Sequence, residues 1–296
     1  MTALLDAVRR HAEAHGNIQG VVPTPIPGLA IVRATMPSDL IHDILRPLVC
    51  LVLQGSKHVT VGTQGFAFCA GQSLLVTADV PTVSQITRAS PAAPYFSLVL
   101  ELDPAVIAGL AAEMTHAQVP DPAPVRVDPT DAEVADAALR LLRLLDRPAA
   151  VPVLSAQLIR EMHYWLLAGG HGAAIRRLGW PEGQVQRVAR AIAVLRAEFR
   201  HRLPVERLAA EAGMSPSTFH QHFRALTSLS PLQFQKHLRL IEARRLMLAE
   251  GASASSAAFA VGYESVPQFT REYGRLFGLS PVRDVEAAKD RLSAAA

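Results

Sequence analysis

The sequence predicts an α+β protein in which a strand-rich N-terminal part precedes an all-helical C-terminal part. Three observations lead to this prediction. Short runs rich in Val, Leu, Ile and Phe, separated by turn residues, fill residues 28–102. Amphipathic helical patterns take over after Asp103. Near the C-terminus one helical pattern occurs twice, at 211–231 and at 261–281.

Composition limits the class of protein before any motif is considered. The chain of 296 residues is half hydrophobic, yet no apolar run approaches the roughly 20 residues that a membrane span needs. The N-terminal 15 residues are charged and predict an amphipathic helix rather than a secretion signal. Two cysteines, Cys50 and Cys69, are too few for a disulfide framework. We therefore expect a cytoplasmic protein with no membrane partner.

The charge of the chain is distributed unevenly. Residues 181–296 contain 16 lysines and arginines against 11 acidic residues, a net charge of +5. Residues 1–180 contain 13 against 15, a net charge of −2. The basic excess therefore accompanies the repeated pattern, as a polyanionic partner requires.

Seven short strands are expected in the N-terminal part, at a spacing typical of a sandwich or small barrel. Glycines and prolines such as Gly55, Gly71 and Pro91 separate them. The predicted strands are 28–36, 47–54, 57–62, 65–70, 73–78, 82–89 and 94–102.

The helical part begins with an Asp103 cap and a proline at the first helical position, which predict a helix over 103–114. A proline-rich stretch at 119–129 predicts a loop. Two amphipathic helices follow at 130–146 and 152–168, and they either cover the strands or pair with a second copy of themselves. Their apolar faces carry Leu139, Leu142, Leu145, Leu158, Trp165 and Leu166.

Each copy of the repeat predicts a short helix, a tight glycine turn and a second helix. Ser215 and Ser265 are suited to cap the second helices. Apolar side chains then recur at helical spacing and predict one buried stripe per copy. These stripes consist of Phe219, Phe223 and Leu226 in the first copy, and of Phe269, Tyr273 and Leu276 in the second.

The opposite face of each second helix is polar, which is also found in helical hairpins that bind nothing. Gln can bridge the edge of adenine and Arg that of guanine, if the helix lies in a major groove. Two copies joined by a continuous helix at 231–250 favour DNA reading, at a spacing of about 34 Å. The polar faces are Ser217, His220, Gln221 and Arg224, and then Pro267, Gln268, Arg271 and Arg275.

Residues 184–288 resemble the C-terminal DNA-binding domain of the AraC family of bacterial transcription regulators. The stretch "AFAVGYESVPQFTREYGRLFGLSPVRD" carries the most specific part of this likeness. The resemblance implies two helix-turn-helix units whose second helices read DNA. It implies as reading residues Ser217, His220 and Gln221 in the first unit, and Gln268 and Arg271 in the second. Arg224 and Arg275 are predicted to bind DNA beside them, which makes a set of seven reading residues.

The N-terminal part resembles the corresponding domain of one AraC subgroup, a cupin-like β-barrel followed by helices. "VLQGSKHVTVG", "GQSLLVTADVP" and "PYFSLVLELD" carry this likeness. It implies a domain that binds a small effector, dimerises, or does both. The expected division is a sensor barrel over 1–120, a helical connector and dimerisation segment over 121–180, and a double helix-turn-helix domain over 181–296.

Candidate sites in the barrel are an effector pocket and a metal centre. The mouth of a barrel is a usual place for a ligand, with Phe66, Phe68, Tyr95 and Phe96 as candidate linings, although such alternation is more often typical of a core. Only His58, with His42 before it, could begin a metal site, and no His-x-His pair is present. No metal or cofactor is therefore expected.

Single reactive side chains are a further possibility, at Lys57, Cys50 and Cys69. Lys57 is expected to be a solvated turn residue. Cys50, in an apolar run, is expected to be buried, and Cys69 is the better candidate for a reactive thiol.

These observations predict a transcription regulator that binds double-stranded DNA and is controlled by a small-molecule effector, not an enzyme. RNA polymerase and a second copy of the chain are further expected partners. Two alternatives stay open: a metal-dependent cupin enzyme with a helical accessory domain, and a DNA-binding protein whose front domain only dimerises.

Overall fold

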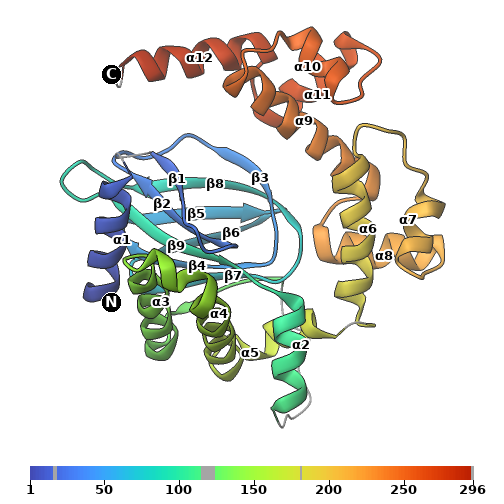
Figure 1. Ribbon diagram of the computed structural model, residues 1–296. Coiled ribbons are helices and arrows are strands. Elements are labelled where there is room, and N and C mark those ends of the chain that lie inside the picture. Colours follow the sequence, from blue (N-terminus) through green and yellow to red (C-terminus); the bar gives the residue numbers. More distant parts are fainter. Residues whose placement is uncertain (16–18, 115–123, 181, 295–296) are drawn as a thin grey trace. The chain divides into compact units, whose positions relative to one another are not determined.

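The computed structural model divides the chain into two compact units (Figure 1). The first comprises residues 1–41 and 45–186, and the second comprises residues 42–44 and 187–296. The structure describes residues 1–15, 19–114, 124–180 and 182–294.

The strands form a six-stranded sheet and a four-stranded sheet, with the strand orders β1-β2-β9-β4-β7-β10 and β3-β8-β5-β6. All of them belong to the first unit except for residues 42–44 of β3. The larger sheet is built from β1 (Gly20–Pro23), β2 (Leu29–Ala34), β4 (Leu48–Gln54), β7 (Gln72–Val76), β9 (Tyr95–Glu101) and β10 (Val125–Pro129). The smaller sheet is built from β3 (Ile41–Leu45), β5 (Ser56–Val61), β6 (Gln64–Cys69) and β8 (Val80–Arg88).

The seven predicted strands are all present. The sequence predicts a sandwich or small barrel, and within the described residues the strands form two sheets that do not close into a barrel. The loop predicted over 119–129 is also wrong in part. Residues 125–129 form β10, which pairs with β7 at the edge of the larger sheet. An edge strand tolerates the proline at its end, Pro129. Residues 119–123 lie outside the described part of the chain.

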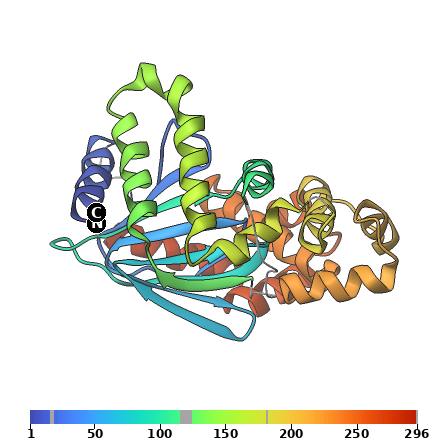
Figure 2. The same ribbon diagram turned by 90° about the horizontal axis from the view of Figure 1, so that it is seen from below.

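The two faces of the larger sheet have different neighbours (Figures 1 and 2). Helix α1 (Thr2–Ala14) contacts β2, β4 and β9. Arg9 of this helix donates a hydrogen bond to Gln54, so the Gln54 face is the helix-covered one. The helix-covered face also carries the buried side chains of Ile31, Leu51 and Leu98. The alternate residues face the smaller sheet, because successive side chains of a strand point to opposite sides.

The connector helices follow the prediction closely. The Asp103 side chain accepts hydrogen bonds from the amides of Ala105 and Val106 and caps α2 (Pro104–Glu113), as predicted. Helices α3 (Ala132–Leu144) and α4 (Val151–Ala168) pack against each other beside the larger sheet (Figure 2). Leu142 of α3 and Leu166 of α4 are buried. A short helix, α5 (Gly172–Arg176), completes the unit.

A buried polar cluster joins α5 to the larger sheet. The Ser73 hydroxyl is hydrogen-bonded to Nε2 of His171 at 2.9 Å. Nδ1 of the same ring lies 3.2 Å from the Asp128 carboxylate. Ser73 and His171 are only 2% and 3% exposed, so this Ser–His–Asp arrangement holds the connector against the sheet and is closed to a substrate.

The second unit is helical and contains the two predicted helix-turn-helix units, α7–α8 and α10–α11. Ser215 and Ser265 cap the second helices by accepting the amides of Thr218 and Gln268, as predicted. The helices are α6 (Gln184–Glu198), α7 (Val205–Glu211), α8 (Pro216–Thr227), α9 (Pro231–Ala249), α10 (Ala254–Ala260), α11 (Val266–Phe277) and α12 (Pro281–Ala294).

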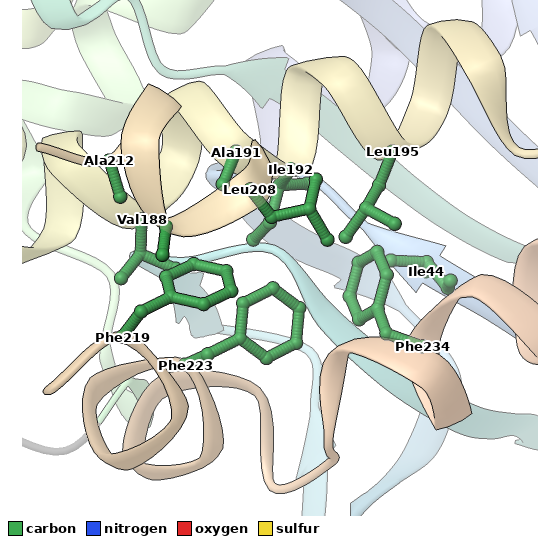
Figure 3. Close-up of a cluster of buried hydrophobic side chains, with 11 residues drawn as sticks. Ile44, Val188, Ala191, Ile192, Leu195, Leu208, Ala212, Phe219, Phe223 and Phe234 are labelled. Atoms are coloured by element: carbon green, nitrogen blue, oxygen red, sulfur yellow. The ribbon is translucent and has the colours of Figure 1, made fainter. Parts of the chain in front are cut away.

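Helix α9 is shared by two hydrophobic cores, one for each helix-turn-helix unit. Its first half contributes Phe234 to a core with α6, α7 and α8, where the Phe223 and Phe234 rings meet edge to face (Figure 3). Its second half contributes Leu240, Ala243 and Met247 to a core with α10 and α11. The two units are therefore attached to one continuous helix.

Arg239, in the middle of α9, ties the two cores together. Its guanidinium donates to the carbonyl of Phe199 at 2.7 Å, after α6, and to that of Gly262 at 2.9 Å, in the second turn. Gly262 has a φ of +88°, and a Cβ there would lie 2.0 Å from the Arg200 carbonyl oxygen. Only glycine fits this position, because both the backbone conformation and the space exclude a side chain.

Gly262→Ala should therefore lower the free energy of unfolding of the second unit by about 3 kcal/mol or more. Gly251→Ala is the matched control, since Gly251 also has a positive φ of +69° but nothing lies within 4 Å of the position that a Cβ would take there. It should cost about 1 kcal/mol. Urea unfolding measures both, and equal losses in the two variants would show that the contact with Arg200 does not matter.

The buried and hydrogen-bonded state of His163 predicts that the stability of the protein depends on pH. Its Nε2 accepts the Asp103 amide at 3.0 Å and its Nδ1 faces the Ile159 carbonyl at 2.8 Å, so the ring must be neutral with the proton on Nδ1. Burial lowers the pKa of His163, although the Ile159 carbonyl and Asp103 oppose this shift. Near pH 6.5 the imidazole of this histidine therefore binds a proton in the unfolded chain but not in the folded chain.

The free energy of unfolding should consequently be constant above about pH 7 and fall below about pH 6.5, by up to about 1.4 kcal/mol per pH unit for this histidine. Denaturant titrations at pH 7.5 and pH 5.5 measure the loss. His163→Gln, which keeps an acceptor for the Asp103 amide, should show a smaller loss than the wild type. An identical pH dependence in the two proteins would contradict the assignment.

Candidate nucleic-acid interface

Helix α8 separates its buried and exposed faces sharply. Phe219 and Phe223 are fully buried and meet with ring centroids 5.4 Å apart. The four predicted reading residues of this helix lie on the other side and are all exposed: Ser217, His220, Gln221 and Arg224. A helix that is anchored by aromatic side chains on one face presents its polar face as a fixed surface.

Helix α11 has the same construction. Phe269 and Tyr273 are fully buried, with ring centroids 5.5 Å apart. Gln268, Arg271 and Arg275 are exposed on the opposite face. The structure thus places all seven predicted reading residues on the outer faces of the two second helices, while their contacts with bases remain a prediction.

Two carboxylates that the sequence reasoning did not single out hold α11 in place. Asp284 of α12 is 4% exposed, pairs with Arg244 of α9 at 2.7 Å, and accepts the Tyr273 hydroxyl at 2.7 Å. Glu272 of α11 accepts hydrogen bonds from Lys236 and from the Tyr263 hydroxyl, both at 2.7 Å. The acidic residues are visible in the sequence, but their partners come from helices far away along the chain.

Seven arginines of the second unit differ in what they bind. Arg207, Arg244 and Arg245 are bound to carboxylates of their own unit, and Arg239 is bound to backbone carbonyls. Arg224, Arg271 and Arg275, in contrast, form no ion pair within the described residues. The cations on the second helices therefore remain available to an anionic partner, and phosphates are such a partner.

The candidate effector residues do not all share one face. Tyr95 lies on the face of the larger sheet that looks toward the smaller sheet, because it follows the same alternation as Ser97. Phe66 and Phe68 lie on the face of the smaller sheet that also carries the buried Val59 and Ile86. Phe96 points to the opposite, helix-covered face of its strand. The side chains of Phe66, Phe68 and Tyr95 therefore lie in the space between the sheets, and that of Phe96 does not.

This space contains unpaired polar atoms. Tyr95 is 0% exposed and Ser97 is 1% exposed, and their hydroxyls lie beside each other without a well-aligned hydrogen bond to any described residue. Burial raises the pKa of Tyr95 far above its ordinary value, with a further contribution from Cys50 beside it, while the Ser97 side chain acts in the opposite direction. The phenol is therefore neutral and can donate a hydrogen bond. A buried hydroxyl without a partner costs about 1–3 kcal/mol.

Several single residues depart from the prediction. Lys57 is not a turn residue; it lies in β5, half-buried, on the face shared with Val59. His42 lies in β3 rather than in a loop. Cys50 is buried, as predicted, and Cys69 is exposed.

Neither a metal-binding cluster nor a membrane-spanning helix occurs among the residues that the structure describes. These residues contain no group of three or more His, Cys, Asp or Glu side chains that could hold a metal ion. None of their helices has both the length and the apolar character to span a membrane.

Two family models match the chain. One, described as the N-terminus of AraC-type transcriptional regulators, matches residues 25–174, and the other, a helix-turn-helix domain, matches residues 208–285. The two matches fall on the two structural units described above.

Individual relatives match shorter segments. The MmsAB operon regulatory protein of Pseudomonas aeruginosa is 34% identical over 89 residues, 30% of this chain and 29% of that protein. The transcriptional activator RhaS of Escherichia fergusonii is 29% identical over 154 residues, 51% of this chain and 54% of that protein. The matched segments thus span about half or less of the length of these relatives.

A solved structure shares the fold over most of the chain. Unsaturated-fatty-acid-bound ToxT of Vibrio cholerae superposes with a TM-score of 0.59 at 7% identity and covers 87% of this chain and 93% of that chain. At this identity the likeness concerns the fold alone.

The unpaired hydroxyl of Tyr95 gives a direct prediction. Tyr95→Phe removes a buried group that has no partner among the described residues, so it should raise the free energy of unfolding by about 1 kcal/mol. Tyr273→Phe is the matched control and should lower it by about 1.5–3 kcal/mol, because that hydroxyl donates to the buried Asp284 carboxylate. A loss of stability in Tyr95→Phe as large as in the control would mean that the Tyr95 hydroxyl is paired in solution.

Proposed function

Because the chain belongs to the AraC-type transcriptional regulators, we propose that it regulates transcription by binding double-stranded DNA and that a small molecule bound to its first unit controls it. The DNA-binding part of this proposal rests on the placement of the reading residues. All seven are exposed on the second helices of two helix-turn-helix units, whose other faces are buried by aromatic side chains.

The two second helices are proposed to enter successive major grooves on one side of the duplex. Because both units pack on α9, their spacing is set within the protein and needs no second copy of the chain. The spacing expected for such a pair is about 34 Å, one turn of DNA. Phosphate contacts from the basic second unit, with its net charge of +5 over residues 181–296, supply most of the affinity.

Base selectivity is assigned to the polar faces. Arg271, exposed and without an ion pair among the described residues, has the geometry for bidentate hydrogen bonds to O6 and N7 of guanine. Gln221 can accept from and donate to base edges, Gln268 adds a polar contact in the second groove, and His220 adds a further donor or acceptor in the first groove. Ser217, Arg224 and Arg275 complete the two contact faces.

The first unit is proposed to be the cupin-like sensor of the protein. Its effector is placed between the two sheets, where Phe66, Phe68 and Tyr95 offer apolar surface. The unpaired hydroxyls of Tyr95 and Ser97 support this placement, since a polar group of a ligand would give them the hydrogen bonds that the described residues do not supply.

A second copy of the chain is proposed as a partner of the connector helices. Val153, Leu154 and Tyr164 of α4 are 66%, 43% and 38% exposed, so this helix presents large apolar side chains to solvent. Large apolar side chains gathered on a surface are typical of contact sites. We also propose that the protein contacts RNA polymerase when it is bound to DNA, because such a contact would let it affect transcription.

The enzyme alternative has no support. One family model describes the N-terminus of AraC-type transcriptional regulators and the other a helix-turn-helix domain, and neither describes an enzyme. The described residues offer no cluster of side chains for the metal of a cupin enzyme.

Replacement of Arg271 tests the DNA-reading proposal. Arg271→Ala should cost about 1–3 kcal/mol of binding free energy at the preferred site and relax the base preference at one position. Arg245→Ala is the charge-matched control, because the Arg245 guanidinium is bound to Glu242 and Glu250. It should alter the base preference nowhere.

Titration of labelled duplexes at fixed salt measures both variants, using the preferred sequence and its single base-pair changes. If Arg271→Ala kept the affinity and the base preference of the wild type, Arg271 would not be a reading residue.

A further inference from the structure

Glu272 lies next to the proposed reading face and contacts one of its residues. Its carboxylate accepts hydrogen bonds from Lys236 of α9 at 2.7 Å and from the Tyr263 hydroxyl at 2.7 Å. It also accepts a hydrogen bond at 3.2 Å from Nε2 of Gln268, one helical turn earlier in α11. The Glu272 side chain is only 16% exposed, so its position is fixed by the surrounding helices.

The carboxylate of Glu272 is ionised at neutral pH. Burial acts to raise the pKa of Glu272, but the hydrogen bonds from Lys236, Tyr263 and Gln268 outweigh it and hold the pKa below its usual value. An ionised carboxylate has no proton and can only accept hydrogen bonds.

This fixes the orientation of the Gln268 side chain. A carboxamide has one end that donates and one that accepts, and only the donating end can face a carboxylate. Nε2 of Gln268 must therefore face Glu272, and Oε1 must face away from it. Within the described residues Oε1 has no hydrogen-bond partner, and the Gln268 side chain is exposed. The reading face thus presents an oriented acceptor at this position.

We propose that Glu272 is a positioning residue for base recognition, which makes Gln268 offer its carboxamide oxygen to an exocyclic amino group in the major groove. Adenine N6 and cytosine N4 are the amino groups exposed there, whereas guanine and thymine present acceptors at the corresponding edge. This inference rests on the proposed function, since it assumes that α11 lies in a major groove.

The first unit of the repeat provides an internal comparison. Gln221 of α8 is exposed in the same way, but the residue one turn later is Ala225, which has no side-chain acceptor. Gln221 can turn either end of its carboxamide outward. Gln268 should therefore discriminate strictly between donor and acceptor groups of bases, and Gln221 should not.

The test begins with selection of binding sites from a randomised double-stranded DNA library by the full-length wild-type protein. The same selection is carried out with Gln268→Ala, Glu272→Gln and Lys236→Met. Gln268→Ala locates the base pair that Gln268 reads. Glu272→Gln replaces the carboxylate by an amide, which can also donate and so allows the Gln268 carboxamide to turn over.

Lys236→Met is the matched control. It removes another contact of Glu272 and weakens the tie between α9 and α11, but it leaves the hydrogen bond between Glu272 and Gln268 in place. A purely structural role of Glu272 would make both variants behave alike.

A second measurement needs no variant. In the selected duplex, the adenine at the Gln268 position is replaced by unsubstituted purine, which lacks N6, or the cytosine by pyrimidin-2-one, which lacks N4. The wild type should lose about tenfold in affinity, and Gln268→Ala should lose nothing further. The same replacement at an uncontacted pair corrects for weakened base pairing.

We expect Glu272→Gln to relax the preference about tenfold at the Gln268 position alone, with the Arg271 position unchanged and with Lys236→Met selecting the wild-type sequence. Two results would overturn the inference: equal binding of the amino-free duplex by the wild type, or wild-type selectivity in Glu272→Gln at a position where Gln268→Ala has lost it. Failure of the wild type to enrich any sequence would instead refute the proposed function.

Discussion

The packing of aromatic side chains against one helix determines what the second unit can do. Phe219 and Phe223 of α8, and Phe269 and Tyr273 of α11, are fully buried in cores to which α9 contributes. A buried aromatic face leaves a helix only one orientation, so the opposite polar face is fixed toward solvent. The seven proposed reading residues are exposed for this reason, and a shared α9 sets the relation between their two groups.

Arginines of the second unit have two different roles beside this packing. Arg239 and Arg244 stabilise the helices by binding carbonyls and the Asp284 carboxylate. Arg224 and Arg271 take no part in such ion pairs within the described residues. The unit thereby keeps its cations on the outer faces free for phosphates and bases, while buried charges are compensated inside, as their desolvation requires.

Much of this organisation could be predicted from the sequence, because periodicity and capping are local properties. The Ser215 and Ser265 caps, the aromatic stripes and seven strands were all predictable in this way. Pairing partners are not local: β10 occurs in a proline-rich stretch and exists because the edge of β7 is free to pair with it. Alternation separates Tyr95 from Phe96, but only the packed helices tell which of them faces the smaller sheet.

The contacts of Glu272 in the site likewise could be predicted from the sequence only in part. Its spacing of four residues from Gln268 is visible in the sequence, whereas Lys236 and Tyr263 reach it only in the folded unit.

The two-groove account as a whole is tested most directly by hydroxyl-radical footprinting of the full-length protein on a selected duplex. It predicts two protected patches on one side of the duplex, centred about 10 base pairs apart. A single patch, or two patches on opposite sides, would contradict it.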